Sequence, residues 1–368
     1  MCGILGSFTT APVANAEALH YAGLGAMSRR GPDDQGLDKF ELPAGRVYLG
    51  HTRLSIIDLS SAGHQPMVSD DDRFSLVFNG EIYNYQELKV ELLQAGFLFK
   101  SDSDTEVLLA AWRCWGEECF TRLTGMFAFV VLDKQLQTLT FARDAFGIKP
   151  LFMTSASGGV SFASELPALL QIKGGAVSLN HQRAYDYLVH GDYDTQNNCF
   201  IEGVEQLAPG HWAVYDLSTA TLQVPKRWWN PSVVQSSSLT FSQAAETLRD
   251  LFLQSVRYHL RSDVPLGTAL SGGVDSSAVV CAIRHVEPDA PIHTFSFIAE
   301  GSPVSEEKWV DLVNAHVGAT SHKVNVEPFE LASDLDDMII AQGEPFGSTS
   351  IYAQYRVFQL AKANGVTV

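Results

Sequence analysis

The chain has 368 residues, of which 46% are hydrophobic and 18% charged, a composition typical of a folded globular protein and unlike that of a disordered chain. Its 42 acidic and 25 basic residues give a net charge of −17, which argues against a general binder of nucleic acid or of membrane surfaces. The chain is longer than is usual for a domain with one hydrophobic core, so two domains are expected.

The N-terminal hexapeptide MCGILG allows two interpretations of Cys2. Removal of Met1 would place the thiol beside its own α-amino group, whose ordinary pKa of about 7.7–8.0 suits it to accept the thiol proton. Alternatively, Cys2 is a small packing residue near a frayed end, which the hexapeptide alone favours. No membrane-length apolar run and no export signal are evident, so we expect a cytoplasmic protein.

The first half of the chain predicts layered antiparallel sheet. Short apolar runs bounded by Gly, Asp, Asn or Ser indicate strands at residues 46–56, 74–79, 126–133, 138–142 and 159–163. Two helices are predicted between them, at 83–96, where Gly96 ends the apolar period, and at 103–116, where a Ser/Asp pair supplies the cap. Together these elements predict an α+β sandwich.

A change of pattern divides the chain. Residues 224–240, VPKRWWNPSVVQSSSLT, contain Pro, Asn and a serine run and show neither helical nor strand periodicity. Beyond them, strands near 264–270, 292–298 and 321–326 alternate with helices, which indicates βαβ units and a parallel sheet. We therefore expect two domains, residues 1–225 and 226–368.

The glycine turn SGGVDSS, residues 271–277, lies between a predicted buried strand and a predicted helix. Two glycines allow a tight turn that exposes backbone N–H groups, and the helix N-terminus attracts an anion, so the turn predicts a phosphate site. It lacks the spacing and lysine of a Walker loop. Because Asp275 would repel phosphate, we expect Mg²⁺ between them. The alternative, a serine-capped helix after a glycine turn, explains Asp275 less well.

Taken together, SGGVDSS and MCGILG identify a family resemblance that covers essentially the whole chain. The turn resembles the pyrophosphate loop of N-type ATP pyrophosphatases, and the pair of motifs resembles the glutamine-dependent asparagine synthetases. The resemblance implies an N-terminal-nucleophile αββα sandwich followed by a Rossmann-like ATP pyrophosphatase domain, here incomplete. It also implies glutamine, aspartate and ATP as substrates with Mg²⁺ as cofactor, and it leaves a homodimer open.

Carried over residue by residue, the resemblance makes Cys2 the glutaminase nucleophile. In the segment NGEIYN, the side chain of Asn79 and the N–H of Gly80 match the oxyanion donors of the family. Arg53 in HTRLSIID suits a grip on the substrate carboxylate, and Asp104 in SDSDTEV matches the residue that holds the α-ammonium group, with Glu81 assisting. Each has an alternative interpretation as turn, solvated side chain or helix cap.

In the second domain, the resemblance assigns the pyrophosphate site to Ser271, Gly272, Gly273, Asp275 and Ser276, with Asp275 also on the metal. Backbone groups of Leu270 and Phe297 are candidate adenine contacts, although both side chains also fit a core strand. The chain stops at ANGVTV, before the family's next glycine-rich loop, so we expect it to be part of a longer protein.

The sequence therefore predicts a glutamine-hydrolysing asparagine synthase that releases ammonia and uses it to amidate an adenylated aspartate. Three alternatives remain: an amidotransferase for a specialised carboxylate, a glutaminase-only form, and a non-catalytic truncated form. A β-lactam-forming relative would not need Cys2, Arg53, Asn79 and Asp104 together, and a storage protein would not need SGGVDSS.

Overall fold

The computed structural model describes residues 1–156, 158–232, 238–303 and 305–368. Contacts divide the chain into two compact units, residues 1–232 (unit 1) and 233–368 (unit 2). The central residues of the predicted linker, 233–237, lie outside the described part of the chain. No described helix combines the length and the apolar character needed to cross a bilayer.

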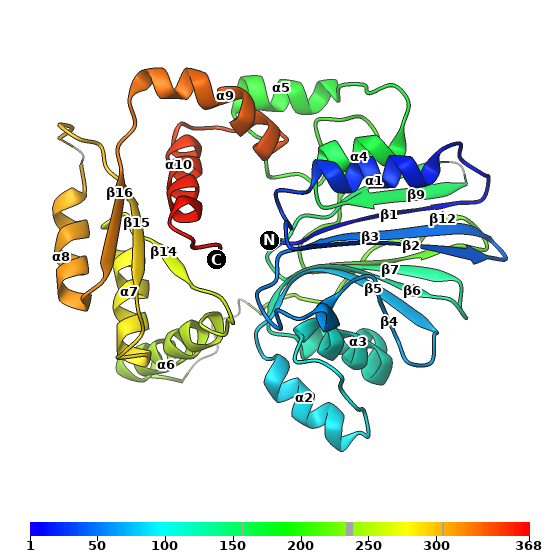
Figure 1. Cartoon of the computed structure of the whole chain (residues 1–368), viewed down its shortest axis with the longest axis horizontal. Coiled ribbons are helices and arrows are strands. Elements are labelled where there is room, and N and C mark those ends of the chain that lie inside the picture. The colour runs from blue at the N-terminus through cyan, green and yellow to red at the C-terminus, as the bar shows by residue number, and fades with distance from the viewer. Residues whose placement is uncertain (157, 233–237, 304) are drawn as a thin grey trace. The chain divides into compact units, whose positions relative to one another are not determined.

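Unit 1 contains two sheets in which the paired strands run antiparallel, as predicted (Figure 1). The first has the order β10-β8-β9-β1-β3-β2, formed by β1 (Gly3–Thr9), β2 (Asp34–Leu42), β3 (Gly45–Arg53), β8 (Phe152–Ala156), β9 (Gly159–Ala163) and β10 (Glu205–Gln206). The second has the order β12-β11-β7-β6-β5-β4, formed by β4 (Met67–Val68), β5 (Phe74–Ile82), β6 (Gly125–Asp133), β7 (Thr138–Arg143), β11 (His211–Asp216) and β12 (Thr221–Leu222), with β13 (Lys226–Arg227) beside β11.

Helices cover the outer faces of the two sheets, which makes unit 1 a four-layer sandwich (Figure 1). α1 (Ala16–Ala26) and α4 (Leu166–Lys173) pack on the first sheet, and α2 (Tyr85–Gln94) and α3 (Asp104–Trp115) pack on the second. Successive side chains of a strand point to opposite faces of its sheet. On β1, Ile4 and Phe8 therefore lie in the layer between the sheets, whereas Leu5 lies in the cluster beneath α1. The predicted αββα fold is confirmed.

The two predicted helices of unit 1 are confirmed, and Ser103 caps α3 by accepting a hydrogen bond from the backbone N–H of Thr105. Among the described residues of unit 1, three further α-helices were missed: α1, α4 and α5 (His181–His190). In α1, Gly23 and Gly25 lower the intrinsic helix propensity and hide the signal. Packing explains Gly23, because a Cβ there would lie 2.9 Å from Cδ2 of Leu5.

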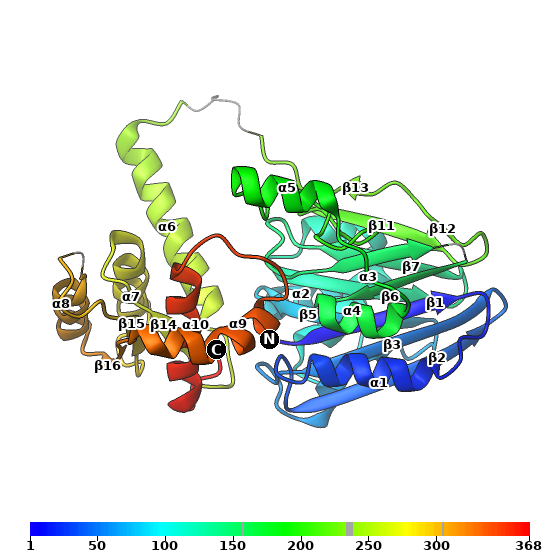
Figure 2. The same cartoon turned by 90° about the horizontal axis from the view of Figure 1, so that it is seen from above.

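Unit 2 has a three-stranded parallel sheet of order β14-β15-β16, and this confirms the predicted α/β class (Figure 2). Its elements are α6 (Phe241–His259), β14 (Gly267–Ala269), α7 (Val274–Val286), β15 (His293–Phe297), α8 (Glu307–Val317), β16 (Thr320–Val324), α9 (Pro328–Gln342) and α10 (Ser350–Ala363). Apolar clusters join α7 and α8 to one face of the sheet and α10 to the other. Beside β14, the carbonyl of Val368 accepts a hydrogen bond from the N–H of Gly267 at 2.7 Å.

Candidate active site

A pocket at the start of β1 brings together residues that are far apart in the sequence. Its walls include five of the predicted glutaminase-site residues, Cys2, Arg53, Gly80, Glu81 and Asp104. The remaining lining residues are Leu54, Ile56, Ile57, Gln65, Phe78, Ser103 and Thr105. Asn79 is not among the lining residues, although it precedes Gly80 on β5.

The thiol of Cys2 lies against the backbone of Leu54, just beyond β3. The N–H of Leu54 donates to Sγ at 3.4 Å, and Sγ lies 3.6 Å from the Leu54 carbonyl. Burial raises the pKa of the Cys2 thiol, while the Leu54 contact and the positively charged N-terminal amine oppose the rise. The carbonyl of Cys2 accepts a hydrogen bond from Nε of Arg30 at 2.8 Å, and Arg30 is held in turn by Glu165 at 2.9 Å. The main chain at Cys2 is therefore fixed by a partly buried cation.

The α-amino group of the chain is buried close to this thiol. Burial lowers the pKa of that amine, carried by Met1, from 8.0 to about 6, and the Cys2 thiol is among the groups that act on it. An amine with this pKa is mostly unprotonated at neutral pH, as a general base must be. Burial therefore leaves this amine unprotonated and able to accept a proton, whereas it makes the Cys2 thiol harder to ionise.

Every second backbone N–H group of β5, at Phe78, Gly80 and Ile82, lies on the edge of the strand that faces away from β6. On β6, the carbonyl of Phe127 accepts from the N–H of Asp144 and its N–H donates to Oδ2 of Asp144, so both groups point away from β5. Gly80 and Phe127 are therefore a non-hydrogen-bonded pair of the β5–β6 ladder. The N–H of Gly80 consequently points away from β6. On the same edge, the N–H of Phe78 donates to Oε1 of Gln65 at 2.6 Å and the N–H of Ile82 donates to Oδ2 of Asp104 at 3.0 Å. The Gly80 N–H lies between these two and borders the pocket.

Asn79 points to the other face of β5, into the layer between the sheets. Its side chain is fully buried, with Nδ2 3.4 Å from Oγ of Ser164, which also accepts from the N–H of Ile4 at 3.0 Å. Oδ1 has no hydrogen-bond partner among the described residues. Rotating the amide by 180° would let the Ser164 hydroxyl donate to Oδ1 and would leave Nδ2, a donor, at the unpartnered position.

Charged groups also line the pocket. Arg53 is 5% exposed, and its Nη1 donates to the carbonyl of Ser60 at 2.6 Å, while its Nη2 donates to carbonyls in the same loop. Two of its five N–H donors remain for a ligand if each of these three contacts occupies one. Burial, with a smaller contribution from the Glu81 carboxylate, raises the pKa of Asp104 to about 7. The wall thus offers a cation beside two carboxylates.

Sequence reasoning missed several residues that support this pocket. Gln65 links β5 to the start of α3, because its Nε2 also donates to Oγ1 of Thr105 at 3.3 Å. Ser164 directly follows β9 and contacts Asn79. Lys149 is 3% exposed, and burial lowers the pKa of its amine near Glu81. These contacts join distant segments, so no local pattern signals them.

In unit 2, the turn before α7 has the geometry expected of a phosphate loop. Gly272 has φ of +86°, and a Cβ there would lie 3.0 Å from the Glu306 carbonyl. Gly273 is the N-cap of α7 and has no side chain to occupy the first N–H groups of the helix. The hydroxyls of Ser271 and Ser276 lie 3.0 Å apart and brace the turn. These residues fit an anion that binds to main-chain N–H groups.

The structure defines the predicted contacts with the metal ion and with adenine less closely than it defines the phosphate turn. Asp275 is exposed in the first turn of α7, and no group of three His, Cys, Asp or Glu side chains suited to a metal ion occurs among the described residues. One carboxylate suits Mg²⁺ when phosphate oxygens supply further ligands. Leu270 is 1% exposed and its N–H donates to the Phe295 carbonyl, whereas Phe297 is 38% exposed at the end of β15.

Comparison with known proteins gives matches along the whole chain. A glutamine amidotransferase domain model matches residues 1–229, and an asparagine synthase model matches residues 247–368. A Bacillus subtilis relative named asparagine synthetase (glutamine-hydrolysing) 1 is 33% identical over 100% of this chain and 57% of its own length. A putative asparagine synthetase of Methanocaldococcus jannaschii is 30% identical over 98% of this chain and 72% of its own length.

A second B. subtilis relative, asparagine synthetase (glutamine-hydrolysing) 3, is 31% identical over 94% of this chain and 57% of its own length. The chain therefore spans little more than half the length of these B. subtilis relatives. Among solved structures, a B. subtilis glutamine phosphoribosylpyrophosphate amidotransferase has a TM-score of 0.45 and 14% identity over 88% of this chain and 81% of that chain.

Proposed function

We propose, from the premise that this chain belongs to the family of glutamine-hydrolysing asparagine synthetases, that unit 1 hydrolyses glutamine and that unit 2 contributes to an ATP-dependent amidation. The observation that carries the proposal is the pocket that gathers Cys2, Arg53, Glu81 and Asp104 around one small space. A thiol, a cation and two carboxylates are the groups needed to bind an α-amino acid and attack its side-chain amide.

In this proposal the charged wall recognises the amino-acid end of glutamine. The remaining N–H donors of Arg53 bind the α-carboxylate, and Asp104 with Glu81 binds the α-ammonium group. The side-chain amide then extends toward Cys2. Holding both ends of the substrate makes the attack effectively intramolecular, which is a large part of the rate enhancement available to an enzyme.

The chemistry starts once Met1 has been removed, so that the α-amino group belongs to Cys2 itself. This amine takes the thiol proton, and Sγ attacks the amide carbon to give a tetrahedral oxyanion. The N–H of Gly80 and the side-chain amide of Asn79 donate to that oxyanion. The C–N bond breaks and the nitrogen leaves as ammonia after taking the proton from the amine. Water then hydrolyses the thioester, which yields glutamate and restores Cys2.

For unit 2 we propose that Ser271, Gly272, Gly273, Asp275 and Ser276 bind the phosphates of ATP with Mg²⁺, and that Leu270 and Phe297 offer backbone contacts to adenine. When bound, ATP and Mg²⁺ activate a carboxylate for attack by ammonia. Aspartate is the acceptor suggested by the named relatives, with asparagine as the product. A specialised carboxylate is the second candidate. We also propose a cytoplasmic location, and a homodimer remains the candidate assembly.

The direct test is to incubate the full chain with glutamine and to measure glutamate and ammonia. The proposal expects equal amounts of both products, in the absence of ATP as well as in its presence, because unit 1 carries the hydrolytic groups. A chain that releases no ammonia from glutamine would contradict it.

The pKa of Asp104 predicts how substrate affinity depends on pH. Because burial raises this pKa to about 7, the carboxylate form needed to bind an ammonium group predominates only above pH 7. We expect the affinity for the product glutamate, measured by calorimetry, to fall as the pH decreases from 8 to 5.5. The fall approaches about tenfold per pH unit at the acidic end. Replacing Asp104 by Asn should weaken binding and remove most of this pH dependence. An affinity that is constant over this range would argue against the role of Asp104.

Gly272 predicts a selective defect in nucleotide binding. At φ of +86° an alanine is strained, and its Cβ would lie 3.0 Å from the Glu306 carbonyl, so Gly272→Ala must shift the turn. We expect the affinity for Mg²⁺–ATP to fall by about 5- to 150-fold, as for about 1–3 kcal/mol of strain, while glutamine hydrolysis is unchanged. The matched control is Gly318→Ala, at φ of +65° with nothing within 4 Å of the added Cβ. Equal affinities for the two variants would contradict the proposed phosphate site.

A further inference from the structure

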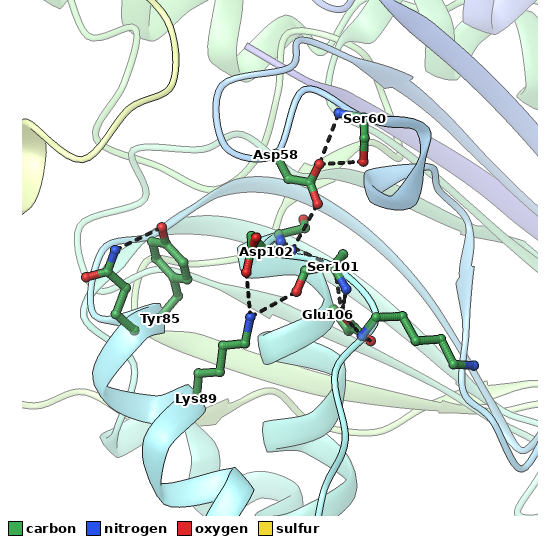
Figure 3. Close-up of polar contacts among 10 residues, drawn as sticks. Asp58, Ser60, Tyr85, Lys89, Ser101, Asp102 and Glu106 are labelled. Atoms are coloured by element: carbon green, nitrogen blue, oxygen red, sulfur yellow. Dashed lines mark hydrogen bonds and ion pairs between the residues drawn. The ribbon is translucent and has the colours of Figure 1, made fainter.

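Asp58 lies in the loop that follows β3, and its carboxylate makes contacts in two directions (Figure 3). Oδ1 accepts hydrogen bonds from the N–H and the hydroxyl of Ser60, at 3.0 and 2.5 Å. Oδ2 accepts a hydrogen bond from the N–H of Asp102 at 3.0 Å. One side chain therefore joins the loop after β3 to the segment that leads into α3.

The backbone of Asp58 contributes to the same loop. Its φ is +56°, a left-handed conformation that Asp tolerates better than most residues. In this conformation the Asp58 carbonyl accepts a hydrogen bond from Nη2 of Arg53, and the nearby Ser60 carbonyl accepts from Nη1 at 2.6 Å. The loop that Asp58 stabilises is thus the loop that orients the Arg53 guanidinium in the pocket.

The segment on the other side of this link is itself firmly held (Figure 3). Nζ of Lys89, on α2, donates to the Ser101 carbonyl at 2.9 Å and to Oδ1 of Asp102 at 2.8 Å. The carboxylate of Glu106, on α3, accepts from the N–H and hydroxyl of Ser101 at 2.8 and 2.6 Å. Asp102 therefore has a fixed position two residues before Asp104, the first residue of α3.

We propose that Asp58 is a positioning residue that sets the separation between Arg53 and Asp104, and so makes the pocket selective for the α-amino acid end of its substrate. The inference rests on the proposed glutaminase function. Arg53, the last residue of β3, is held by carbonyls of the loop after β3, and Asp104 is the first residue of α3. The Asp58 carboxylate is hydrogen-bonded both to that loop and to the segment that leads into α3. Loss of the link leaves Cys2 and the oxyanion donors in place but lets the two charged groups move apart.

The test compares kinetic constants for glutamine hydrolysis by the full chain and its variants. We expect Asp58→Ala to raise KM for glutamine by at least about tenfold, as for the loss of hydrogen bonds to a charged group. The value of kcat should stay within about threefold, because the interaction lost is one that binds substrate and transition state alike. Asp58→Gly tolerates the positive φ and should show the same rise in KM, whereas Asp58→Asn should recover part of the affinity.

A matched control is available at Asp72, which also has a positive φ, of +57°, and pairs with Lys134 at 2.6 Å on the protein surface. Asp72→Ala makes the same change of charge and backbone preference, and it should leave KM unaltered. A second readout uses a monoamide substrate that lacks the α-ammonium group: Asp58→Ala should impair its hydrolysis much less than that of glutamine. General damage to the fold would impair both substrates alike.

The outcomes separate the two proposals. If the unsubstituted chain releases no ammonia from glutamine, the proposed function fails and this inference fails with it. If that chain is active and Asp58→Ala and Asp58→Gly keep its KM, or lose kcat on both substrates equally, only the positioning role of Asp58 is overturned. Should Asp58→Ala fail to fold, Asp58→Gly decides the result, because it removes the carboxylate without backbone strain.

Discussion

Replacement of Cys2 by alanine is expected to abolish the release of ammonia from glutamine. In the proposed mechanism, Sγ forms the covalent bond to the substrate, and no other described group of the pocket is a thiol. Removal of a nucleophile usually lowers kcat by several powers of ten, so we expect a loss of at least about 10³-fold. The measurement is glutamate production at saturating glutamine. Alanine is also small, so removal of Met1 should proceed as in the unsubstituted chain.

The control for this experiment is Cys114→Ala. Cys114 is a free, partly buried cysteine that packs against the cluster beneath α2 and α3, and it lies at the end of α3 opposite to Asp104. Its replacement should leave hydrolysis within about twofold, since it only trims a packing contact. Glutamine hydrolysis that persists in the Cys2→Ala chain would show that another group attacks the substrate.

Replacement of Asn79 by alanine is expected to lower kcat for glutamine hydrolysis by about 10²–10³-fold, the effect typical of removing one oxyanion donor. The reason is that the amide of Asn79 is fully buried, held on one side by Ser164, and has an unpartnered polar atom on the other. In the proposed mechanism the amide is turned so that Nδ2 takes this position, and this donor gains a partner only when charge develops on the substrate oxygen. KM should therefore change little, and the measurement is the full dependence of rate on glutamine concentration.

Ser75 provides the matched control for Asn79. It lies on β5, four residues earlier and on the same face, and its hydroxyl is fully buried without a partner among the described residues. Ser75→Ala removes a buried polar group from the same layer and should leave both kinetic constants unchanged. An Asn79→Ala chain that behaves like Ser75→Ala would contradict the oxyanion role and leave only the Gly80 N–H for it.

Much of the architecture could be predicted because its signals are local. Alternating and continuous apolar runs predicted the strands β3, β5 and β6, and Ser103 predicted the start of α3. The motif SGGVDSS follows a predicted strand and precedes a predicted helix, and the structure places β14 and α7 there. The expectation that this strand is buried was wrong, because Gly267 and Thr268 are only partly buried and Ala269 is exposed. Helix α1 was missed because Gly23 and Gly25 weaken its local signal and tertiary packing supplies its stability.

The sequence predicted which types of side chain form the candidate site, but not the residues that hold these side chains in place. Cys2, Arg53 and Asp104 were selected as types of side chain in recognisable motifs, and the structure brings them to one pocket. Their roles remain predictions. The residues that hold them could not be found in the same way: the contact between Ser164 and Asn79 and the link from Asp58 to Asp102 join segments 85 and 44 residues apart. Such contacts depend on how the sheets and helices pack, which no short motif encodes.

The central claim is that Cys2, with its own free α-amino group, is the nucleophile that attacks glutamine. The most direct measurement is to react the purified chain with a glutamine analogue whose side-chain amide is replaced by an electrophilic ketone, and to locate the adduct by peptide mass spectrometry. The account predicts one adduct per chain, on an N-terminal peptide that begins with Cys2 and lacks Met1. An adduct on any other residue, no adduct at all, or a labelled peptide that retains Met1 would contradict it.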